Sequence, residues 1–297
     1  MTVATSCSHN RLLPTVIANC HHQLPVTIYD RGVLLEGGGG SMDVALFSPA
    51  ALFHDDDDDD NDIINEACHA AAEGKESPDQ QDIHVERIHS FPGADLIIRE
   101  FSFHQLNANL LWPGTFAFSN WLVENRSLLQ GTRILEIGSG TGALAIFLRR
   151  SFGVDITTSD FDDTEIEGNI AYNCRANGLP ELPHIRHTWG DKFPTSEPDW
   201  DMIIASDILL YVKQYPNLIR TLCFLLNNYK PKENVSDGIV LPISGKEVKL
   251  LWPFFLMSWR RRLGGEEKLF FKGCEDAGLT VYDAGARVYC ISGKKIA

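Results

Sequence analysis

The chain lacks any Cys-x-x-Cys pair and any long hydrophobic run. Its seven cysteines are odd in number and scattered over 297 residues, which favours a reducing compartment and argues against a disulfide framework or a structural zinc site. A membrane-spanning helix needs roughly 18 consecutive apolar residues, and no run in this chain approaches that length. The N-terminus also lacks the apolar core of a secretory signal. We therefore expect a protein of the cytoplasm, or of both cytoplasm and nucleus, with no membrane partner and no metal.

Basic residues are scarce at the start of the chain. Residues 1–82 contain three basic and fifteen acidic side chains, a net charge of −12, and include six consecutive aspartates at 55–60. Such a segment cannot bury enough apolar surface to fold alone. The remaining 215 residues carry 23 basic and 25 acidic side chains, a net charge of −2. The sequence therefore predicts an acidic, low-complexity, poorly ordered extension over 1–82 and one nearly neutral folded domain over 83–297.

From Ile83 onward, strand patterns alternate with helix patterns, which predicts a parallel α/β sheet. Two strands come first, at 83–88 and 96–101, and a helix is expected over 115–129. The strands expected in the sheet are 133–137, 154–158, 184–188, 201–205 and 254–259, with a closing pair at 279–283 and 286–292. Helices are expected at 142–151, 163–177, 213–229 and 266–277, and a polar insertion at 230–250. The prediction is a Rossmann-like, seven-stranded mixed sheet with helices on both faces.

A glycine-rich turn follows the first strand of this expected sheet, between Glu136 and the apolar helix that begins near Gly142. Glycines let the main chain turn tightly and approach a ligand that a β-carbon would exclude. The pattern of Gly138 and Gly140 by itself fits either a dinucleotide or S-adenosylmethionine. A carboxylate at Glu136 would repel a pyrophosphate but would attract an amino group and a sulfonium. The acid therefore favours S-adenosylmethionine.

Polar residues also follow the next three strands of the expected sheet. Asp160 lies twenty residues beyond Gly140, Trp189 follows the third strand, and Asp207 follows the fourth. The carboxyl ends of parallel strands meet at one edge of a sheet, where α/β proteins bind ligands. An acid after the second strand accepts hydrogen bonds from ribose hydroxyls, and a tryptophan can stack on adenine. Together with Glu136 at the end of the first strand, these three residues lie at the ends of four successive strands, and this arrangement predicts an adenosine-type ligand.

Residues 96 to about 292 resemble the class I, seven-β-strand methyltransferases, and within that class methyltransferase family 16, the non-histone protein-lysine methyltransferases. The resemblance rests on the segments Leu111-Trp112-Pro113, Ile134 to Gly142, Thr158-Ser159-Asp160, Asn169 to Asn173, Trp189-Gly190-Asp191 and Asp199 to Tyr211. It implies transfer of a methyl group from S-adenosylmethionine to a lysine side chain of a partner protein.

The resemblance also implies which residues form the site. The expected cofactor-binding residues are of two kinds. Those that match the family's cofactor contacts are Trp112, Gly138, Ser139, Gly140, Asp160, Trp189 and Ser206. Glu136 and Gly142 are added because they are the acid and the last glycine of the glycine-rich turn. The family has an Asp-x-x-Tyr motif on the substrate side after the fourth strand. Here Asp207 matches, position 210 is leucine, and the tyrosine stands one residue later, as Tyr211. Asp207 and Tyr211 are the expected catalytic residues, with Asp207 orienting the amine or relaying its proton.

The sequence leaves more than one acceptor open. The chain lacks both the Asn/Asp-Pro-Pro-aromatic motif and the Pro-Cys pair of nucleic-acid methyltransferases, and its nearly neutral domain has little affinity for phosphate. A nucleic-acid partner is therefore not expected. A small-molecule N-methyltransferase and a non-catalytic module that binds S-adenosylmethionine stay open, because a fold does not define its acceptor. The protein is expected to be a monomer.

Two polar segments each have two explanations. The helix over 163–177 carries Glu165, Asn169, Asn173 and Asn177 at intervals of four, which fits either a solvated face or support for the Asp160 loop. Three arginines at 260–262 end the fifth strand. They would either contact an acidic partner or simply be solvated.

Overall fold

The computed structural model of the chain describes residues 84–101, 104, 106–232, 237–243, 246–260 and 265–293. The extension expected over 1–82, the start of the first strand at Ile83, and residues 261–262 lie outside the described residues. The chain divides into two units, Met1–Ala67 and Cys68–Ala297, and all described residues belong to the second. The domain boundary at residue 82 stays a prediction.

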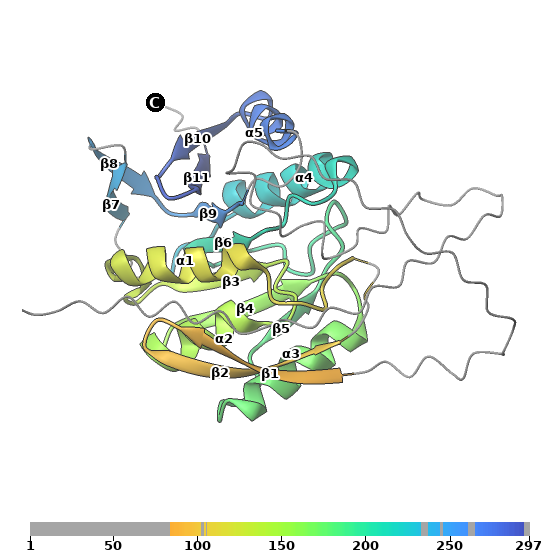
Figure 1. The fold of residues 1–297 in the computed structure, drawn as a ribbon. Helices are drawn as coiled ribbons and strands as arrows, with labels where there is room; N and C mark the ends of the chain where they lie inside the picture. The colour runs from red at the N-terminus through yellow and green to blue at the C-terminus, as the bar shows by residue number, and fades with distance from the viewer. Residues whose placement is uncertain are drawn as a thin grey trace, which may run out of the picture. The chain divides into compact units, whose positions relative to one another are not determined.

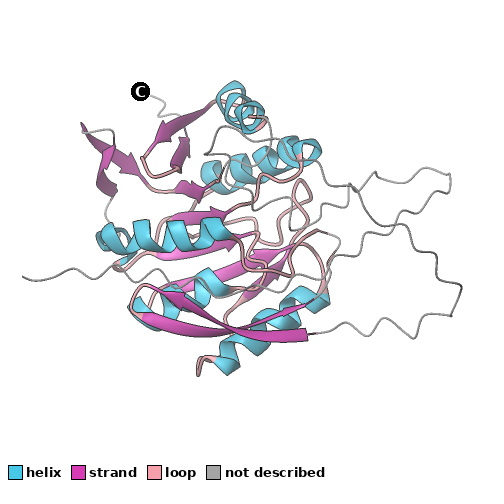
Figure 2. Cartoon of the chain, in the orientation of Figure 1, coloured by secondary structure: helices cyan, strands magenta, loops and turns pink. Residues whose placement is uncertain are grey.

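Figures 1 and 2 show strands alternating with helices along most of the described chain. The strands are β1 (His84–Phe91), β2 (Ala94–Phe101), β3 (Arg133–Ile137), β4 (Asp155–Asp160), β5 (His184–Arg186), β6 (Met202–Ser206), β7 (Gly238–Ile243), β8 (Lys246–Leu251), β9 (Phe254–Ser258), β10 (Leu279–Asp283) and β11 (Val288–Gly293). The α-helices are α1 (Pro113–Glu124), α2 (Ala143–Phe152), α3 (Thr164–Ala176), α4 (Tyr215–Asn227) and α5 (Glu267–Asp276). Short 3₁₀ turns are η2 (Arg126–Leu129) and η3 (Val212–Gln214).

Seven of the strands form one sheet in the order β10-β11-β9-β6-β3-β4-β5. The pairs β9–β6, β6–β3, β3–β4 and β4–β5 are parallel, whereas β11 is antiparallel to both of its neighbours. The predicted seven-stranded mixed sheet is therefore confirmed. Because β3 and β6 are adjacent while their helices lie on opposite faces, the strand order reverses beside β3. That is the place where an open α/β sheet binds ligands.

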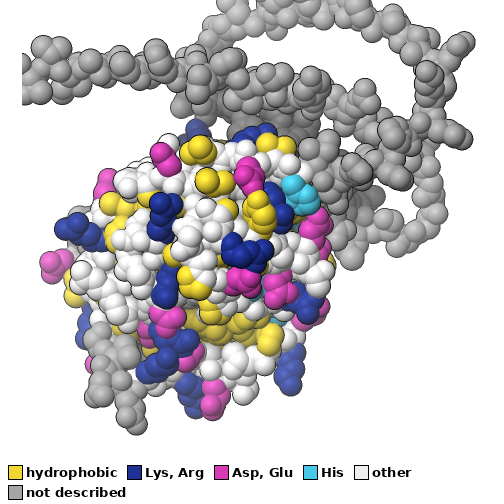
Figure 3. Space-filling view, turned by 90° about the horizontal axis from the view of Figure 1, so that it is seen from below, with side chains coloured by type: hydrophobic (Ala, Val, Ile, Leu, Met, Phe, Trp, Pro, Cys, Tyr) yellow, Lys and Arg dark blue, Asp and Glu magenta, His cyan; other side chains and the backbone are white. Residues whose placement is uncertain are grey.

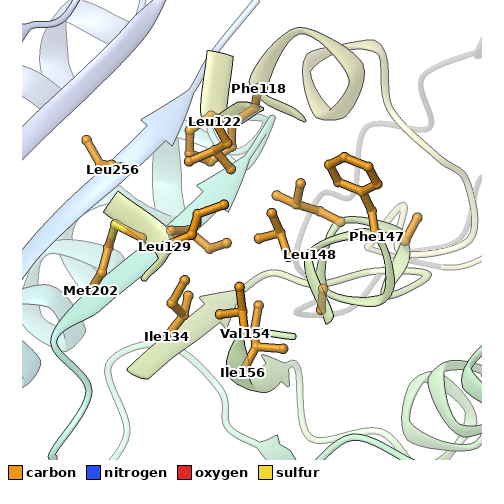
Figure 4. Packing of buried hydrophobic residues seen from close by; sticks show 14 of the residues in the cluster. Phe118, Leu122, Leu129, Ile134, Phe147, Leu148, Val154, Ile156, Met202 and Leu256 are labelled. Carbon is orange, nitrogen blue, oxygen red and sulfur yellow. The ribbon is translucent and has the colours of Figure 1, made fainter. Parts of the chain in front are cut away.

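Helices cover both faces of this sheet, as predicted. On one face, apolar side chains of α1, α2 and α3 pack on alternate residues of the strands, such as Ile134 and Ile204. Figure 4 shows Phe118 and Leu122 of α1 and Phe147 and Leu148 of α2 in this layer. On the other face, α4 and α5 pack on the intervening strand residues. The rigid packing on both sides holds the carboxyl ends of the strands in position.

A separate two-stranded sheet, β1–β2, packs against α3 through asparagine side chains. Asn177 Oδ1 accepts the Ile97 N–H at 3.0 Å and its Nδ2 donates to the Ile97 carbonyl at 2.7 Å. Asn173 Oδ1 accepts the Arg99 N–H at 2.7 Å, and its Nδ2 donates to the Thr141 carbonyl of the glycine loop at 3.0 Å. We call Asn169, Asn173 and Asn177 the asparagine ladder, because their amides bond to the edge of β2 as a neighbouring strand would.

The ladder decides between the two explanations for this helix. Asn169 and Asn173 are 1% and 0% exposed, so a solvated face is wrong for these residues, although Glu165 is exposed. The sequence suggested that this helix supports the Asp160 loop. In the structure, the ladder instead supports the glycine loop, through the bond from Asn173 to the Thr141 carbonyl. The physical cause is the hairpin, whose edge offers unpaired backbone groups that must be satisfied.

Three sequence expectations differ from the structure. The helix expected over 115–129 runs from Pro113 to Glu124 and is followed by a 3₁₀ turn, because Asn125 caps it through its side chain and backbone. The helix expected over 213–229 begins at Tyr215, after a 3₁₀ turn. The segment expected as a polar insertion over 230–250 contains the hairpin β7–β8. Its alternating Leu241, Ile243 and Leu250 are buried against the first core layer.

One face of the described residues mixes both signs of charge (Figure 3). In the view of Figure 3, Lys and Arg side chains are interspersed with Asp, Glu and hydrophobic side chains. Among the helices in the described ranges, none is both long and apolar enough to span a bilayer.

Candidate functional site

The glycine loop between β3 and α2 is held by its own hydrogen bonds and by β4. The Ser139 N–H donates to the Ser159 carbonyl at 3.1 Å, and the Ser139 hydroxyl donates to the Glu136 carbonyl at 3.0 Å. Gly138, Gly140 and Gly142 have φ angles of +66°, +51° and +76°. These values lie in the left-handed region that favours glycine. The structure thus confirms the tight turn expected from the sequence.

Glu136 is the buried acid of this site. It lies in β3, is 2% exposed, and its Oε2 has no hydrogen-bond partner among the described residues. Burial raises the pKa of Glu136 to about 8, and the nearby Asp160 adds to the increase, while a backbone N–H at Ala145 opposes it. An unpartnered buried carboxylate is costly unless a cation or donor meets it. Glu136 is therefore suited to receive the cationic group of a ligand.

Asp160 is the last residue of β4 and lies over the glycine loop. Its Oδ2 accepts the Gly140 N–H at 2.7 Å and its Oδ1 accepts the Phe161 N–H at 2.7 Å. Burial raises the pKa of Asp160, and these two N–H donors act in the opposite direction. Each carboxylate oxygen has two lone-pair sites. Asp160 therefore keeps the capacity to accept hydrogen bonds from a ribose as well.

Trp189 and Ile208 form the wall next to Gly138. An ideal β-carbon on Gly138 would lie 3.5 Å from Cζ2 of Trp189 and 2.6 Å from Cγ2 of Ile208. Trp189 follows β5, and Ile208 follows β6, so both reach the loop from the carboxyl edge of the sheet. The expected tryptophan is thus brought to the glycine loop. Ile208 was missed, because an isoleucine after a strand looks like an ordinary core residue.

The end of β6 is joined to the start of α1. The Ser206 and Thr115 hydroxyls are hydrogen-bonded at 2.9 Å. Asp207 is 2% exposed, has a φ of +53°, and accepts the Gly114 N–H through Oδ2 at 2.6 Å. Its Oδ1 accepts the Arg260 backbone N–H at 3.2 Å. Asp207 therefore binds the first turn of α1, and its expected contact with an acceptor amine stays a prediction.

We expect Asp207→Asn to destabilise the fold. The asparagine side chain has one carbonyl oxygen, whereas the Asp207 carboxylate accepts the N–H groups of both Gly114 and Arg260. In the variant, the NH₂ group therefore faces one of these two donors. We expect the free energy of unfolding to fall by about 1–3 kcal/mol. Urea unfolding measures this, with Asp191→Asn on an exposed loop as the matched control. An Asp207→Asn protein as stable as the wild type would contradict the anchoring role.

Trp112, Asn107 and Tyr211 come together at the border of the site. The Trp112 indole N–H donates to the Asn107 carbonyl at 3.1 Å, and the Asn107 Nδ2 donates to the Tyr211 hydroxyl at 2.7 Å. Burial raises the pKa of Tyr211, and the hydrogen bond from Asn107 partly offsets this. Asn107 was not predicted from sequence, because it stands in no motif and meets Tyr211 only through the fold.

Contacts in the described residues close into a ring around the glycine loop. Gly138 faces Ile208, the adjacent Asp207 binds Gly114, and α1 begins directly after Trp112. Trp112 binds the carbonyl of Asn107. The next residue, Ala108, lies beside Gly140, because its carbonyl oxygen would be 3.6 Å from a β-carbon placed on that glycine. The nine expected cofactor residues and both expected catalytic residues lie on or beside this ring.

The residues of the ring fit S-adenosylmethionine. Glu136 offers a buried carboxylate with one unpartnered oxygen, Oε2, for the amino group, and Gly138 packs so closely on Ile208 that a β-carbon would collide with it. Asp160 and Trp189 offer a hydrogen-bond acceptor and an aromatic face for the adenosine. Among the described residues, no group of three His, Cys, Asp or Glu side chains is placed to hold a metal ion.

The fold is the Rossmann-like architecture of the class I methyltransferases, and the site offers groups suited to S-adenosylmethionine. A solved structure with this architecture is the T. thermophilus 16S rRNA N2 G1207 methyltransferase RsmC in complex with AdoMet and guanosine, with a TM-score of 0.50 and 16% identity, covering 74% of this chain and 53% of that chain. At this identity the likeness shows the fold alone. Residues 90–235 match the family described as lysine methyltransferase. This match, over just under half of the chain, agrees with the family that the sequence motifs predicted.

Curated relatives agree with the class. A histone-arginine methyltransferase, METTL23 of Rattus norvegicus, is 29% identical over 142 residues, 46% of this chain and 63% of that protein. EEF1A lysine methyltransferase 3 of Xenopus tropicalis is 28% identical over 155 residues, 48% of this chain and 65% of that protein. The electron transfer flavoprotein beta subunit lysine methyltransferase of Mus musculus is 33% identical over 100 residues, 33% and 37% of the two chains. The chain spans less than two thirds of the length of each of these relatives.

Proposed function

We propose that this protein transfers a methyl group from S-adenosylmethionine to the Nζ atom of a lysine in a non-histone protein. The observation that carries the cofactor assignment is the buried carboxylate of Glu136, whose Oε2 has no partner among the described residues, beside a glycine loop with no room for a β-carbon at Gly138. The family match over 90–235 and the two relatives named as lysine methyltransferases support lysine as the acceptor.

Each residue of the site has a separate task in this proposal. When bound, S-adenosylmethionine supplies an electrophilic methyl group. Glu136 binds the amino group, Asp160 accepts from the ribose hydroxyls, and Trp189 with Ile208 excludes water from the loop at Gly138. Most of the rate acceleration comes from holding the reacting groups in position.

The acceptor must arrive as a neutral amine. A free lysine has a pKa of about 10.4, and removal from water beside a positive charge lowers that pKa. The ring supplies two polar groups on the acceptor side. They are the hydroxyl of Tyr211 and the carboxylate of Asp207, which is held in place by the Gly114 N–H. Both residues belong to the segment after β6, at the same edge of the sheet as the glycine loop.

The rat relative named as a histone-arginine methyltransferase makes arginine the main rival acceptor among proteins. A small-molecule amine is a rival acceptor outside the proteins, and a non-catalytic binding module is the rival to an enzyme. We further propose a cytoplasmic monomer without a nucleic-acid partner. The nearly neutral charge of residues 83–297 supports the absence of a nucleic-acid partner.

The deciding experiment incubates the full chain with S-adenosylmethionine labelled in its methyl group and an extract of its own cells. We expect a labelled protein band, and mass spectrometry of that band should find methyl-lysine. Gly138→Ala, whose β-carbon would collide with Ile208, serves as the control with weakened cofactor binding and reduced labelling.

The remaining outcomes each identify a different error. Label on arginine would overturn the lysine assignment, and label only in the small-molecule fraction would overturn the protein acceptor. Binding of S-adenosylmethionine by calorimetry without any transfer would leave the non-catalytic module as the function.

A further inference from the structure

Asn107 connects the two halves of the site. Its backbone carbonyl accepts from Trp112, on the expected cofactor side, at 3.1 Å. Its side-chain amide donates to the hydroxyl of Tyr211, on the expected acceptor side, at 2.7 Å. The residue has a φ of +56°, which asparagine tolerates better than most residues with a β-carbon. An asparagine at this turn can therefore place both groups at once.

The loop that carries Asn107 is itself well anchored. His104 Nδ1 accepts the Leu106 N–H at 3.2 Å, and Glu100 Oε1 accepts the Leu111 N–H at 3.1 Å. The Asn109 amide donates to the Phe101 carbonyl at 2.9 Å. The bonds to Glu100 and Phe101 join the loop to β2, and the bond to His104 lies within the loop, so the Asn107 amide is a donor held in a fixed position.

We propose that Asn107 is a positioning residue that orients the Tyr211 hydroxyl toward the acceptor amine. The inference rests on the proposed function, because it assumes that a neutral amine enters beside Tyr211. The amide hydrogen of Asn107 occupies one lone pair of the phenol oxygen. The second lone pair remains to accept an N–H of the amine, which turns the nitrogen lone pair toward the methyl group.

The state of Tyr211 fits this role. Burial raises the pKa of Tyr211 above its ordinary value of 10.0, so at neutral pH the phenol is uncharged. Tyr211 therefore does not serve as a general base but can orient the amine by hydrogen bonding. The lysine ammonium gives one proton to water before transfer. Its nitrogen then bonds to the methyl carbon as the carbon–sulfur bond breaks, and the sulfur keeps that electron pair, so no further reactant is needed.

The principal test is Asn107→Gly. Glycine keeps the positive φ and the backbone carbonyl that Trp112 binds, so the variant removes only the amide donor. We expect kcat/KM for the protein acceptor to fall about tenfold, the value of one good hydrogen bond, with an unchanged dissociation constant for S-adenosylmethionine. Tyr211→Phe should give a similar loss, and adding Asn107→Gly to Tyr211→Phe should cost nothing more.

Two further measurements separate positioning from general loosening of the loop. Asn109→Gly, in the same loop but bonded to Phe101 instead of Tyr211, should reduce stability and cofactor affinity together. NMR of ¹³C-labelled tyrosine should show a higher pKa of Tyr211 in Asn107→Gly, because the donor that lowers it is gone.

The inference and the proposed function fail in different ways. A wild-type chain that transfers no methyl group to any protein overturns the proposed function. With an active wild type, multiplicative losses in the double variant, an equal loss of cofactor affinity in Asn107→Gly, or an unchanged titration of Tyr211 would each overturn the role of Asn107.

Discussion

Gly138→Ala is expected to weaken the binding of S-adenosylmethionine by about ten- to hundredfold, as overpacking a rigid site costs about 1–3 kcal/mol. The new methyl group would stand 2.6 Å from Cγ2 of Ile208, which is 7% exposed and has little room to move. The same methyl group would lie 3.5 Å from Cζ2 of Trp189, so it would press on both side chains that pack against the loop. Calorimetric titration with S-adenosylmethionine measures the effect directly.

The matched control for this variant is Gly153→Ala. Gly153 has a φ of +67°, against +66° at Gly138, but no atom lies within 4 Å of its β-carbon position. Both variants therefore carry the same backbone strain, and only Gly138→Ala adds the collision. If the two variants bind S-adenosylmethionine equally well, the glycine loop does not contact the cofactor and the site must be sought elsewhere.

Glu136→Gln is expected to stabilise the cofactor-free protein in alkali while weakening its affinity for S-adenosylmethionine. The pKa of Glu136 rises from 4.5 to about 8 on folding, chiefly by burial. Between these values the folded state holds a proton that the unfolded state has released. The free energy of unfolding therefore falls as pH rises from 4.5 to about 8, by an amount on the order of a few kcal/mol.

Glutamine does not titrate, so the variant should match the wild type at a pH below about 4 and exceed its stability above about 8. Urea unfolding at a series of pH values, without cofactor, gives the difference between the two curves. Glu165→Gln, on the exposed side of α3, should leave the curve unchanged. Parallel curves for wild type and Glu136→Gln would mean that Glu136 is not buried as an unpartnered acid.

Local patterns predicted most of the fold. The strand expected at 133–137 has those bounds in the structure, because Ile134, Leu135 and Ile137 are apolar and the glycine turn at Gly138 follows directly. The hairpin β7–β8 was missed because β8 contains Lys246, Glu247 and Lys249, which made the segment resemble a polar insertion. The end of α1 depends on Asn125 bonding back to Trp121, a cap that competes with continued helix.

The site was predictable to the extent that its residues lie in motifs. Glu136, Asp160 and Trp189 each belong to or follow a recognisable strand, and the fold needs only to bring the strands side by side. Asp207 and Gly114 are 93 residues apart, and Asn107 and Tyr211 are 104 apart. Such pairs depend on where α1 and its preceding loop rest on the sheet, which no local pattern contains.

The asparagine ladder makes the chain sensitive to chemical ageing. Asn177 precedes Gly178, and an asparagine before glycine is the pair most prone to lose its amide nitrogen as ammonia. Its Nδ2 donates to the carbonyls of Ile97 and Asn173. Conversion to aspartate would place a carboxylate against those two oxygens, so an old molecule would lose the attachment of β2 to α3 at Ile97, while Asn173 and Asn169 keep their bonds to Arg99.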